Sequence, residues 1–287
     1  MKNFEYLEAK TVREASALLA QCQGKARVLA GGTDLLVAMK RRQITPEYII
    51  NIKRIPDLDY VRYREGQGLK VGALATLHSL ERSHAVQQRF PVLASAIGKM
   101  ASPGIRNLAT IGGNLCNASP AADTAPALIG LAALAKVEGP AGERLSHVEE
   151  FFLGPGQNAL HNDEILTEIQ IPESPSHTRG AYFKLSRTAA DLAIVGVAFF
   201  ATFDSKHSSV IEAKIVLGAV GPTPMRARQA EALIKGKGTK EVPIEKVAEL
   251  AAAEALPICD VRASANYRQH MVKVMVARAI RQVLTDE

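Results

Sequence analysis

The sequence predicts an α+β fold made of two domains, and three observations support this prediction. The chain has 287 residues, about the length of two ordinary domains. A stretch rich in Pro and Ser, residues 172–177, separates two regions of regular apolar patterning and is typical of a joint. Beyond this joint, runs typical of strands are followed by runs typical of helices, which favours segregated sheet and helices. We therefore expect domains at residues 1–175 and 178–287.

The composition is that of an ordinary globular protein. Apolar residues make up 47% of the chain and charged residues 22%, so disorder is not expected. The net charge of +6 would attract polyanions such as nucleotide phosphates or acidic protein surfaces. However, Lys and Arg are spread along the chain, and Trp and interleaved aromatic and basic residues are absent. The sequence therefore does not predict nucleic-acid binding.

The sequence carries no targeting, membrane or metal signal. Residues 1–10 contain no apolar stretch of signal-peptide length, and the longest apolar run, residues 192–203, is too short to span a bilayer. We expect a cytoplasmic protein without a transmembrane segment. Cys22, Cys116 and Cys259 lie far apart and predict neither a disulfide framework nor a zinc or iron–sulfur site. We expect all three to be buried as small apolar side chains.

Residues 1–55 have the pattern of a compact α/β unit. We expect a helix at residues 11–22 that begins from a Thr cap. Residues 26–32 predict a buried strand that ends in a glycine turn, and residues 33–42 predict a helix directly after it. The β-branched content and alternation of residues 48–55 predict another strand.

Residues 56–175 begin with an expected hairpin whose turn lies near Gly66 and Gly68. A helical pattern follows at residues 77–101 and is broken at Pro91. The remaining expected elements are a helix at 122–134 and strands at 136–139 and 164–172. Beyond the joint we expect strands at 180–186, 192–203 and 210–221, and helices at 225–236, 244–255 and 265–284.

Two Gly-Gly pairs, Gly31–Gly32 and Gly112–Gly113, follow apolar runs and raise the question of what they are for. Glycine loses more entropy on folding than other residues, so such pairs need a local reason. Glycines let backbone N–H groups approach a pyrophosphate without a clash from a Cβ atom. One such cradle would use Gly31, Gly32 and Thr33, and a second would use Thr110, Gly112, Gly113 and Asn114. The alternative is that both pairs are ordinary strand-to-helix turns.

Other nucleotide and catalytic motifs do not compete with this interpretation. Residues 154–159, GPGQNA, match G-x-G-x-x-A formally, but no strand-glycine-helix pattern surrounds them, and Pro155 has no amide to donate. The sequence contains no G-x-x-x-x-G-K-[ST], no G-x-S-x-G and no H-E-x-x-H motif.

Four segments, in this order and spacing, carry a close resemblance to a known family. They are AGGTDLL at 30–36, IRNLATIGGNLCNASPAADTAPAL at 105–128, EILTEIQIP at 164–172 and FKLSRTAADLAIVGVA at 183–198. The chain resembles the FAD-binding medium subunit of molybdenum hydroxylases, a family that includes carbon monoxide dehydrogenase, bacterial xanthine dehydrogenase, nicotinate and quinoline oxidoreductases and 4-hydroxybenzoyl-CoA reductase.

The resemblance implies a specific architecture. It implies an FAD-binding domain of the vanillyl-alcohol-oxidase and murein-reductase type, with subdomains at about residues 1–55 and 56–175. A flavoprotein C-terminal domain would follow, with a three-stranded antiparallel sheet and helices.

The resemblance also assigns cofactor-binding residues. In the first motif these are Leu29, Ala30, Gly31, Gly32, Thr33, Asp34 and Leu35, around the pyrophosphate and adenosine. In the second motif they are Thr110, Gly112, Gly113 and Asn114, on the diphosphate and flavin side, with Ala101 nearby. Asp123 would bind the sugar-like chain, Leu166 would make a backbone contact, and Lys184 would lie close to the flavin, where it would stabilise the reduced anionic form.

Several of these residues also have plainer interpretations. Asp34 and Asp123 each suit the start of a helix, where an acidic side chain is favoured. Lys184 should lie on the opposite strand face from Phe183 and Leu185, and it is a solvated lysine in the alternative interpretation. Arg106 and Asn107 would position the loop of the second motif.

Three features separate this chain from some relatives within the resemblance. The segment SPAADTAP at 119–126 runs without the four-cysteine insertion that carries an extra iron–sulfur cluster in 4-hydroxybenzoyl-CoA reductases. Leu192 stands where some relatives place a Tyr over the flavin. No His lies in or beside AGGTDLL, so we expect non-covalent FAD.

The function implied by the resemblance is electron transfer. A large molybdopterin-binding subunit would oxidise the substrate, and a small subunit with two [2Fe–2S] clusters would conduct electrons to the FAD of this chain. The flavin would pass them to NAD, a quinone or another acceptor, in a dimer of heterotrimers. This chain would supply no catalytic residue and no metal ligand. The alternatives are a self-sufficient flavin oxidoreductase and a non-catalytic assembly module of the same fold.

Overall fold

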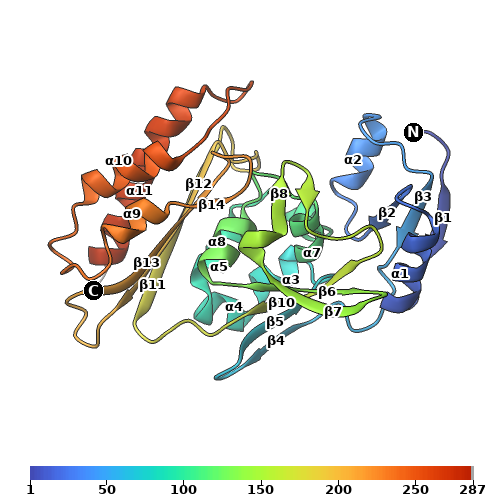
Figure 1. The fold of residues 1–287 in the computed structure, drawn as a ribbon, viewed down its shortest axis with the longest axis horizontal. Helices are drawn as coiled ribbons and strands as arrows, with labels where there is room; N and C mark the ends of the chain where they lie inside the picture. Colours follow the sequence, from blue (N-terminus) through green and yellow to red (C-terminus); the bar gives the residue numbers. More distant parts are fainter. Residues whose placement is uncertain (286–287) are drawn as a thin grey trace.

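The N-terminal unit is a small parallel sheet with two helices, and it lies at one end of the molecule in the computed structural model, which describes residues 1–285 (Figure 1). The strand order is β1-β3-β2, and both pairs are parallel. As expected, the first helix is capped by Thr11, whose Oγ1 accepts a hydrogen bond from Glu14 N at 3.0 Å. The elements are β1 (Glu5–Glu8), α1 (Val12–Gln21), β2 (Ala26–Leu29), α2 (Leu35–Lys40) and β3 (Tyr48–Asn51).

A five-stranded antiparallel sheet forms the centre of the molecule, in the order β4-β5-β10-β6-β7. Its first two strands are the expected hairpin, and Gly66 and Gly68 both have positive φ at the turn. The strands are β4 (Val61–Arg64), β5 (Gly68–Gly72), β6 (Leu134–Gly139), β7 (Gly142–His147) and β10 (Ile165–Ile171).

Short helices pack on one face of this sheet and carry the second glycine motif. The predicted helical run breaks at Pro91, as expected, and also at Ser83, which has extended backbone. The elements are α3 (Leu77–Arg82), α4 (His84–Arg89), α5 (Pro91–Gly98), α6 (Pro103–Arg106), α7 (Ile111–Cys116), α8 (Thr124–Gly130), a 3₁₀ turn at Val148–Phe151, β8 (Phe152–Gly154) and β9 (Gln157–Asn158).

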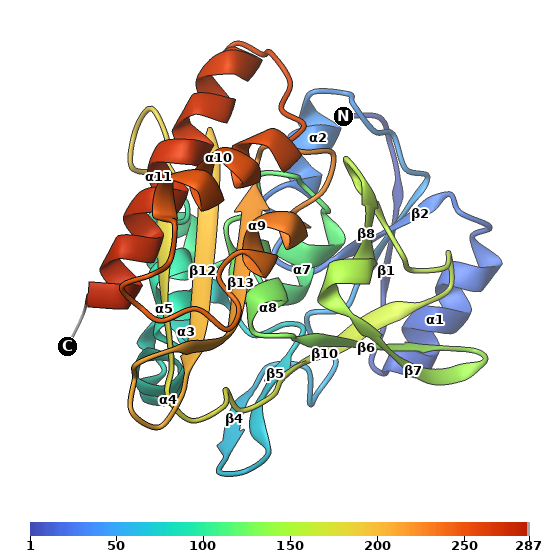
Figure 2. The ribbon, with the colours of Figure 1, turned by 60° about the vertical axis from the view of Figure 1, so that its left-hand side comes forward.

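The C-terminal part is an antiparallel sheet in the order β11-β12-β13-β14, with α10 and α11 on its outer face (Figure 2). The expectation of three strands was wrong because Met225 and Arg226 pair with β13 as a fourth strand. The helix expected from residue 225 therefore begins only at Arg228. The elements are β11 (Thr178–Leu185), β12 (Val195–Phe203), β13 (Val210–Gly218), β14 (Met225–Arg226), α9 (Arg228–Ala232), α10 (Ile244–Glu254) and α11 (Ala265–Thr285).

The C-terminal sheet shares its inner face with the helices of the N-terminal part. Tyr182, Ala198, Phe200 and Val216 belong to the same buried apolar cluster as α5 and α8. A Cβ atom at Gly130 would lie 2.1 Å from the ring of Phe200, so only glycine permits this close contact. The sheet is thus packed on both faces.

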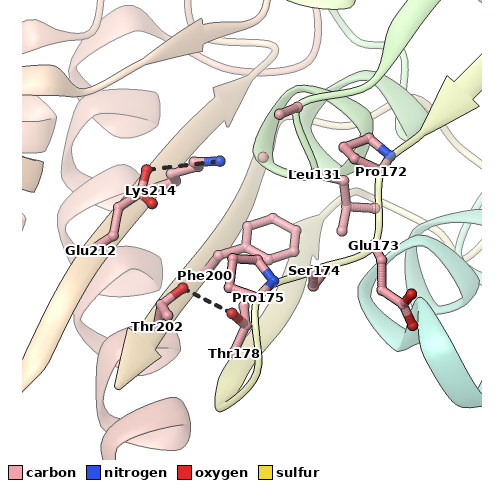
Figure 3. A pocket seen from close by; sticks show the side chains of 12 residues that line it. Leu131, Pro172, Glu173, Ser174, Pro175, Thr178, Phe200, Thr202, Glu212 and Lys214 are labelled. Carbon is pink, nitrogen blue, oxygen red and sulfur yellow. Dashed lines mark hydrogen bonds and ion pairs between the residues drawn. The ribbon is translucent and has the colours of Figure 1, made fainter. Parts of the chain in front are cut away.

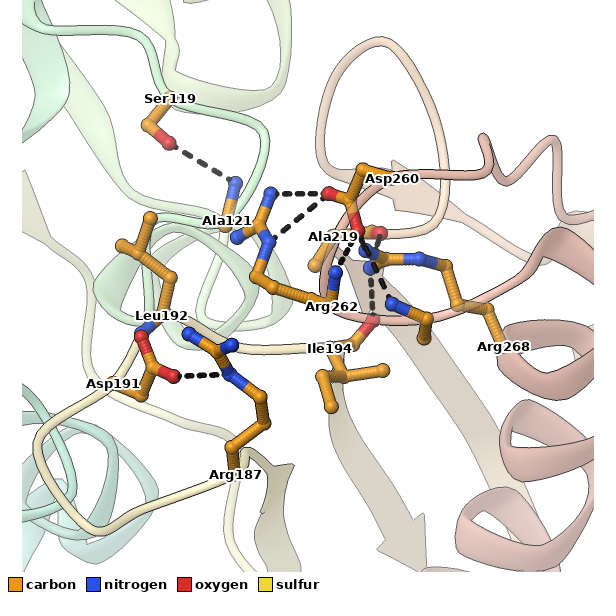
Figure 4. A network of polar contacts seen from close by, with 11 residues as sticks. Ser119, Ala121, Arg187, Asp191, Leu192, Ile194, Ala219, Asp260, Arg262 and Arg268 are labelled. Atoms are coloured by element: carbon orange, nitrogen blue, oxygen red, sulfur yellow. Dashed lines mark hydrogen bonds and ion pairs between the residues drawn. The ribbon is translucent and has the colours of Figure 1, made fainter.

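Polar contacts add to this junction (Figure 4). The side chain of Arg268, on α11, is only 1% exposed. Its guanidinium donates to the carbonyl of Ile194 at 2.6 Å, to the carbonyl of Ala219 at 3.1 Å and to Asp260 Oδ1 at 2.7 Å. The N–H of Ala219 donates to the carbonyl of Pro120 at 2.8 Å, which links this network to the segment after the second glycine motif.

The cysteines only partly follow the expectation. Cys22 is buried, Cys116 is half-buried and Cys259 is exposed, so the prediction of three buried thiols was wrong for Cys259. Residues 1–285 contain no group of three or more side chains arranged to hold a metal ion. None of the helices described in this range is long and apolar enough to cross a membrane.

Candidate functional site

A cavity of about 770 Å³ lies between the N-terminal unit and the central sheet, and both glycine motifs line it. This volume is in the range of ligand-binding cavities. Gly31 belongs to the loop between β2 and α2, whereas Gly112 and Gly113 belong to the first turn of α7. The fold therefore brings together two loops that are remote in sequence.

Each glycine of the first pair has its own steric reason. A Cβ atom at Gly31 would lie 2.2 Å from the carbonyl oxygen of Leu108, so glycine lets the first loop pack directly against the segment before the second motif. Gly32 has a φ of +77°, in the left-handed region that glycine adopts without strain.

The first loop presents a run of free backbone donors. Within residues 1–285, the N–H groups of Gly31, Gly32, Thr33, Asp34 and Leu35 find no protein acceptor, and all five residues line the cavity. Unpaired amides on residues that line a cavity are suited to an anionic ligand such as a phosphate.

The second motif differs from the expected second cradle because its amides already have acceptors. Gly112 N donates to the carbonyl of Ala73, and Gly113 N donates to Thr110 Oγ1, each at 3.0 Å. Asn114 N donates to the carbonyl of Thr110 at 3.0 Å. Thr110 therefore serves as the N-cap of α7. This motif lines the cavity at Gly113 with backbone that carries no side chain. An added Cβ atom there would contact only Thr110 Oγ1, at 2.8 Å.

Asp123 and Lys184 form a buried ion pair outside the cavity lining. Lys184 Nζ lies 2.8 Å from Asp123 Oδ2, and the two side chains are 3% and 4% exposed. Lys184 Nζ also donates to the carbonyl of Lys99 at 2.9 Å, and Tyr182 Oη donates to Asp123 Oδ1 at 2.9 Å. Lys99 Nζ donates in turn to the carbonyl of Tyr182 at 2.6 Å. These four residues are called the Asp123 cluster below, and Lys184 is not the solvated lysine of the plainer interpretation.

Burial and contacts act in opposite directions on this carboxylate. Burial raises the pKa of the Asp123 carboxyl, whereas its contacts with Lys184 and Tyr182 lower it. Burial also raises the pKa of the Tyr182 hydroxyl well above its ordinary value, so Tyr182 stays a hydrogen-bond donor at neutral pH. Asp123 stands at the N-cap of α8, yet its side chain makes no capping hydrogen bond there.

The structure gathers most, but not all, of the predicted residues around the cavity. Those that line it are Ala30, Gly31, Gly32, Thr33, Asp34, Leu35, Gly112, Gly113 and Leu166. Those outside the lining are Leu29, Ala101, Thr110, Asn114, Asp123 and Lys184. Asp34 stands at the N-cap of α2, as the plainer interpretation expects, although its side chain makes no capping hydrogen bond there. Ala101 has a φ of +46°, and its carbonyl accepts a hydrogen bond from Arg106 at 3.2 Å, which agrees with a positioning role for Arg106.

A third wall of the cavity was not predicted from the sequence. It is formed by Leu153, Gly156, Gln157, Asn158, Leu160, His161, Asn162, Glu164 and Ile165. The segment GPGQNA falls within this wall, but as the β8–β9 hairpin rather than a strand-glycine-helix turn. Asn158 Nδ2 donates to the carbonyl of Cys116 at 2.7 Å, so this wall is fixed against the end of α7. The only sequence signal was the pair of closely spaced glycines.

A second, smaller cavity of about 240 Å³ lies where the joint crosses the C-terminal sheet (Figure 3). Phe200, Lys214 and the joint residues Pro172 and Pro175 line it. Thr178 and Thr202 share a hydrogen bond of 2.8 Å at its edge. Neither glycine motif reaches this cavity.

A large cavity with free amides on one side and a glycine wall on another defines a protein that binds a dinucleotide or a similar anion. Residues 2–174 match the family described as "FAD binding domain in molybdopterin dehydrogenase". Residues 180–283 match "CO dehydrogenase flavoprotein C-terminal domain". The chain therefore belongs to the family of FAD-binding flavoprotein subunits of molybdenum-containing dehydrogenases, which confirms the resemblance seen in the sequence.

Individual relatives agree over nearly the whole chain. The "Carbon monoxide dehydrogenase medium chain" of Hydrogenophaga pseudoflava is 36% identical over 277 residues, which cover 96% of each chain. The "Xanthine dehydrogenase FAD-binding subunit" of Escherichia coli O157:H7 is 31% identical over 281 residues, which cover 97% of this chain and 95% of that one.

Solved structures show the same fold. A structure of carbon monoxide dehydrogenase from H. pseudoflava, which lacks the Mo-pyranopterin moiety of its molybdenum cofactor, superposes with a TM-score of 0.94 at 37% identity, over 98% of this chain and 96% of that one. Quinoline 2-oxidoreductase from Pseudomonas putida 86 gives a TM-score of 0.91 at 26% identity, over 99% and 98% of the two chains. The expected flavoprotein fold class is confirmed.

Proposed function

We propose that this chain holds FAD non-covalently in the glycine-lined cavity and relays electrons within a larger molybdenum hydroxylase. The observation that carries the proposal is the run of free amides at Gly31–Leu35 facing a cavity whose other wall is Gly113. Together with the family membership, it supports FAD as the cofactor and these amides as the binding site of its diphosphate.

The residues present fit this cofactor. The amides of residues 31–35 would hold the diphosphate, and the first motif would also contact the adenosine. The flat wall at Gly113 leaves room for the diphosphate and the chain that leads to the flavin. Among residues 1–285, His161 is the one histidine that lines the cavity, and it lies on the third wall rather than beside the first motif. That arrangement supports a non-covalent FAD.

The Asp123 cluster has a different place in this proposal. Asp123 and Lys184 satisfy each other in the structure and do not line the cavity. We assign them to the flavin end because Asp123 follows the second motif in sequence and Lys184 contacts it. Their roles toward the sugar-like chain and the flavin stay predictions.

In this proposal the chemistry is divided among subunits. Bound FAD supplies the ability to exchange electrons singly with one partner and in pairs with another. The chain's own residues bind and orient it. The electrons would come from a small subunit with [2Fe–2S] clusters, which receives them from a large molybdopterin-binding subunit. An external acceptor such as NAD or a quinone would take them, and the complex would be a dimer of heterotrimers.

The names of related proteins support a multisubunit enzyme. Relatives are called a medium chain of carbon monoxide dehydrogenase, an FAD-binding subunit of xanthine dehydrogenase and a medium chain of glyceraldehyde dehydrogenase. All three names describe parts of larger enzymes, and they favour neither a self-sufficient oxidoreductase nor an assembly module.

The proposal extends to domain division and location. Domains at residues 1–175 and 178–287 are supported by the family matches at 2–174 and 180–283. A cytoplasmic location is supported by three free cysteines, one of which is exposed, because thiols persist in reducing compartments.

The FAD content of the purified chain tests the proposed function. We expect a yellow protein with about one FAD per chain, and we expect the apoprotein to regain the flavin absorption bands when FAD is added. FAD released by acid precipitation, without covalent label on the protein, would distinguish non-covalent binding. A colourless chain that does not respond to FAD would contradict the proposal.

A further inference from the structure

The Asp123 cluster connects the C-terminal sheet to the region of the second glycine motif. Tyr182 and Lys184 lie on β11, whereas Asp123 and Lys99 belong to the N-terminal part. Both carboxylate oxygens of Asp123 accept a hydrogen bond from β11, one from Tyr182 and the other from Lys184. The orientation of this buried carboxylate is therefore set from the C-terminal sheet.

A second set of contacts leads from Asp123 to the cavity wall. Thr124, the next residue, is fully buried, and its Oγ1 donates to Asn114 Oδ1 at 2.5 Å. Asn114 lies in the turn of α7 that begins at Thr110, and the same turn carries Gly113. Only Gly113 of these residues lines the cavity, so the path runs from β11 through the protein interior to the ligand side.

We propose that Tyr182 is a positioning residue for the flavin site. It fixes Asp123, and through Thr124 and Asn114 it holds the turn that forms the Gly113 wall. FAD affinity therefore depends on the contacts that β11 makes with the N-terminal part. The inference rests on the proposed FAD site and adds to it a residue that does not touch the cofactor cavity.

The physical basis is the demand of a buried carboxylate for its donors. Asp123 is 4% exposed, so an oxygen that loses its partner cannot turn to water without moving the chain. An unsatisfied buried charged group is costly, and the segment relaxes to find another donor. Because Thr124 follows directly, that relaxation disturbs its bond to Asn114. A separate hydrogen bond, from Lys99 Nζ to the backbone carbonyl of Tyr182, keeps β11 in place when only the Tyr182 hydroxyl is removed.

The test uses the full chain, freed of flavin and titrated with FAD. Tyr182→Phe keeps the ring and removes the donor, and we expect FAD affinity to fall about tenfold, the effect of one hydrogen bond to a charged group. Thr124→Val removes the hydrogen bond to Asn114 with little change in side-chain volume, and we expect a similar loss of FAD affinity. The matched control is Tyr63→Phe. Tyr63 lies on β4, outside the cavity lining, and its hydroxyl donates to Glu173 Oε1 at 2.6 Å. That control should bind FAD like the unaltered chain.

Two further measurements separate positioning from general destabilisation. At saturating FAD, the visible circular dichroism of the flavin should change in Tyr182→Phe and Thr124→Val but not in Tyr63→Phe. Combining Tyr182→Phe with Asp123→Asn should weaken binding no more than Asp123→Asn alone, because both act through one carboxylate.

The outcomes distinguish this inference from the proposed function. Failure of the unaltered chain to bind FAD overturns the proposed function itself. Normal FAD binding by Tyr182→Phe and Thr124→Val overturns the inference alone. Additive losses in the double variant, or an equal loss in Tyr63→Phe, also overturn it.

Discussion

At Gly31 a Cβ atom would lie 2.2 Å from the carbonyl oxygen of Leu108, whereas at Gly113 it would meet only the Thr110 hydroxyl, at 2.8 Å. At Gly112 it would lie 2.7 Å from both the Cβ atom and the carbonyl oxygen of Ala73. Gly31 and Gly112 are thus required by protein packing, and Gly113 faces the ligand space. Two glycines that are adjacent in sequence therefore have different sensitivities to substitution.

Gly113→Val is expected to abolish FAD binding while the chain still folds. The valine side chain would occupy the space that the proposed diphosphate needs, so we expect affinity to fall at least a hundredfold. Crowding at Thr110 would weaken the cap of α7 and cost about 0.5–2 kcal/mol of stability. Equilibrium FAD titration and thermal unfolding of the apoprotein measure the two effects separately.

Two comparison variants sharpen this experiment. Gly98→Val, at the end of α5, has more room, with Glu81 Oε1 at 3.8 Å as the nearest neighbour of an added Cβ atom, and should keep FAD. Gly112→Val should lower the unfolding temperature strongly, because backbone atoms of Ala73 cannot move away. Normal FAD content in Gly113→Val would contradict the proposed cavity.

Only those parts of the site that belong to a recognisable sequence motif could be predicted from the sequence. The predicted residues that line the cavity are Leu166, residues 30–35 of the first motif, and Gly112 and Gly113 of the second. The wall at residues 153–165 was missed because its side chains come from a short hairpin and loops with no periodicity. The sequence also could not show that the amides of Gly112, Gly113 and Asn114 are hydrogen-bonded. Their acceptors, on Ala73 and Thr110, depend on tertiary structure and helix capping.

At the scale of elements, long apolar patterns were predicted well, whereas several short strands were missed. The helices at α1, α10 and α11 were expected, and so were the buried strands β10, β12 and β13. In contrast, β1 and β7 are partly exposed and polar, and β14 has two residues. Their pairing with neighbours, rather than their own sequence, makes them strands.

The loop before α11 is held by Asp260, whose surroundings favour the charged form. Partial burial alone would raise the pKa of this carboxyl. The N–H groups of Arg262 and Ala263 and the guanidinium groups of Arg262 and Arg268 outweigh burial and hold that pKa well below its usual range. Asp260 therefore stabilises the folded chain by a pH-dependent amount.

Asp260→Asn is expected to lower the free energy of unfolding by about 1–2 kcal/mol at pH 7. The carboxyl has a lower pKa in the folded chain than in the unfolded chain, where it is about 3.9. Its contribution is therefore complete above about pH 5 and is lost as the pH falls through the folded-state pKa. Urea unfolding at pH 7 and pH 3 should show a smaller difference between the two proteins at pH 3. The exposed Asp59→Asn serves as control, and a difference that grows in acid would contradict the argument.

At the scale of the whole molecule, the fold class could be predicted from the sequence. The packing of the C-terminal sheet against the N-terminal part could not. Its inner face carries Tyr182, Ala198 and Phe200, which join the core of the N-terminal part. Alternation in β12 is hidden because both faces are buried, so the sequence pattern gave no sign of which face meets which partner. The joint at 172–177 is therefore a link between parts that share a core.

Purification from the native organism should yield a complex rather than the single chain. We expect this chain with one larger and one smaller partner, and we expect the complex to contain molybdenum and iron in addition to FAD. Affinity purification with metal and flavin analysis measures this directly. The isolated chain, loaded with FAD, should show no oxidation of substrates that the complex oxidises. A fully active single chain would favour a self-sufficient flavin oxidoreductase.

FAD should stabilise both parts of the molecule together. At a free FAD concentration of about 100 times Kd, binding adds about 2.7 kcal/mol to the free energy of unfolding. For a chain of this size, that corresponds to a rise in Tm of about 4–5 °C. The cavity is lined only by residues of the N-terminal part, yet the shared core and the Asp123 cluster couple the C-terminal sheet to it. Scanning calorimetry should therefore show one transition that moves as a whole when FAD is added and does not move in Gly113→Val. Two separate transitions, of which FAD shifts only one, would show that the two parts unfold independently.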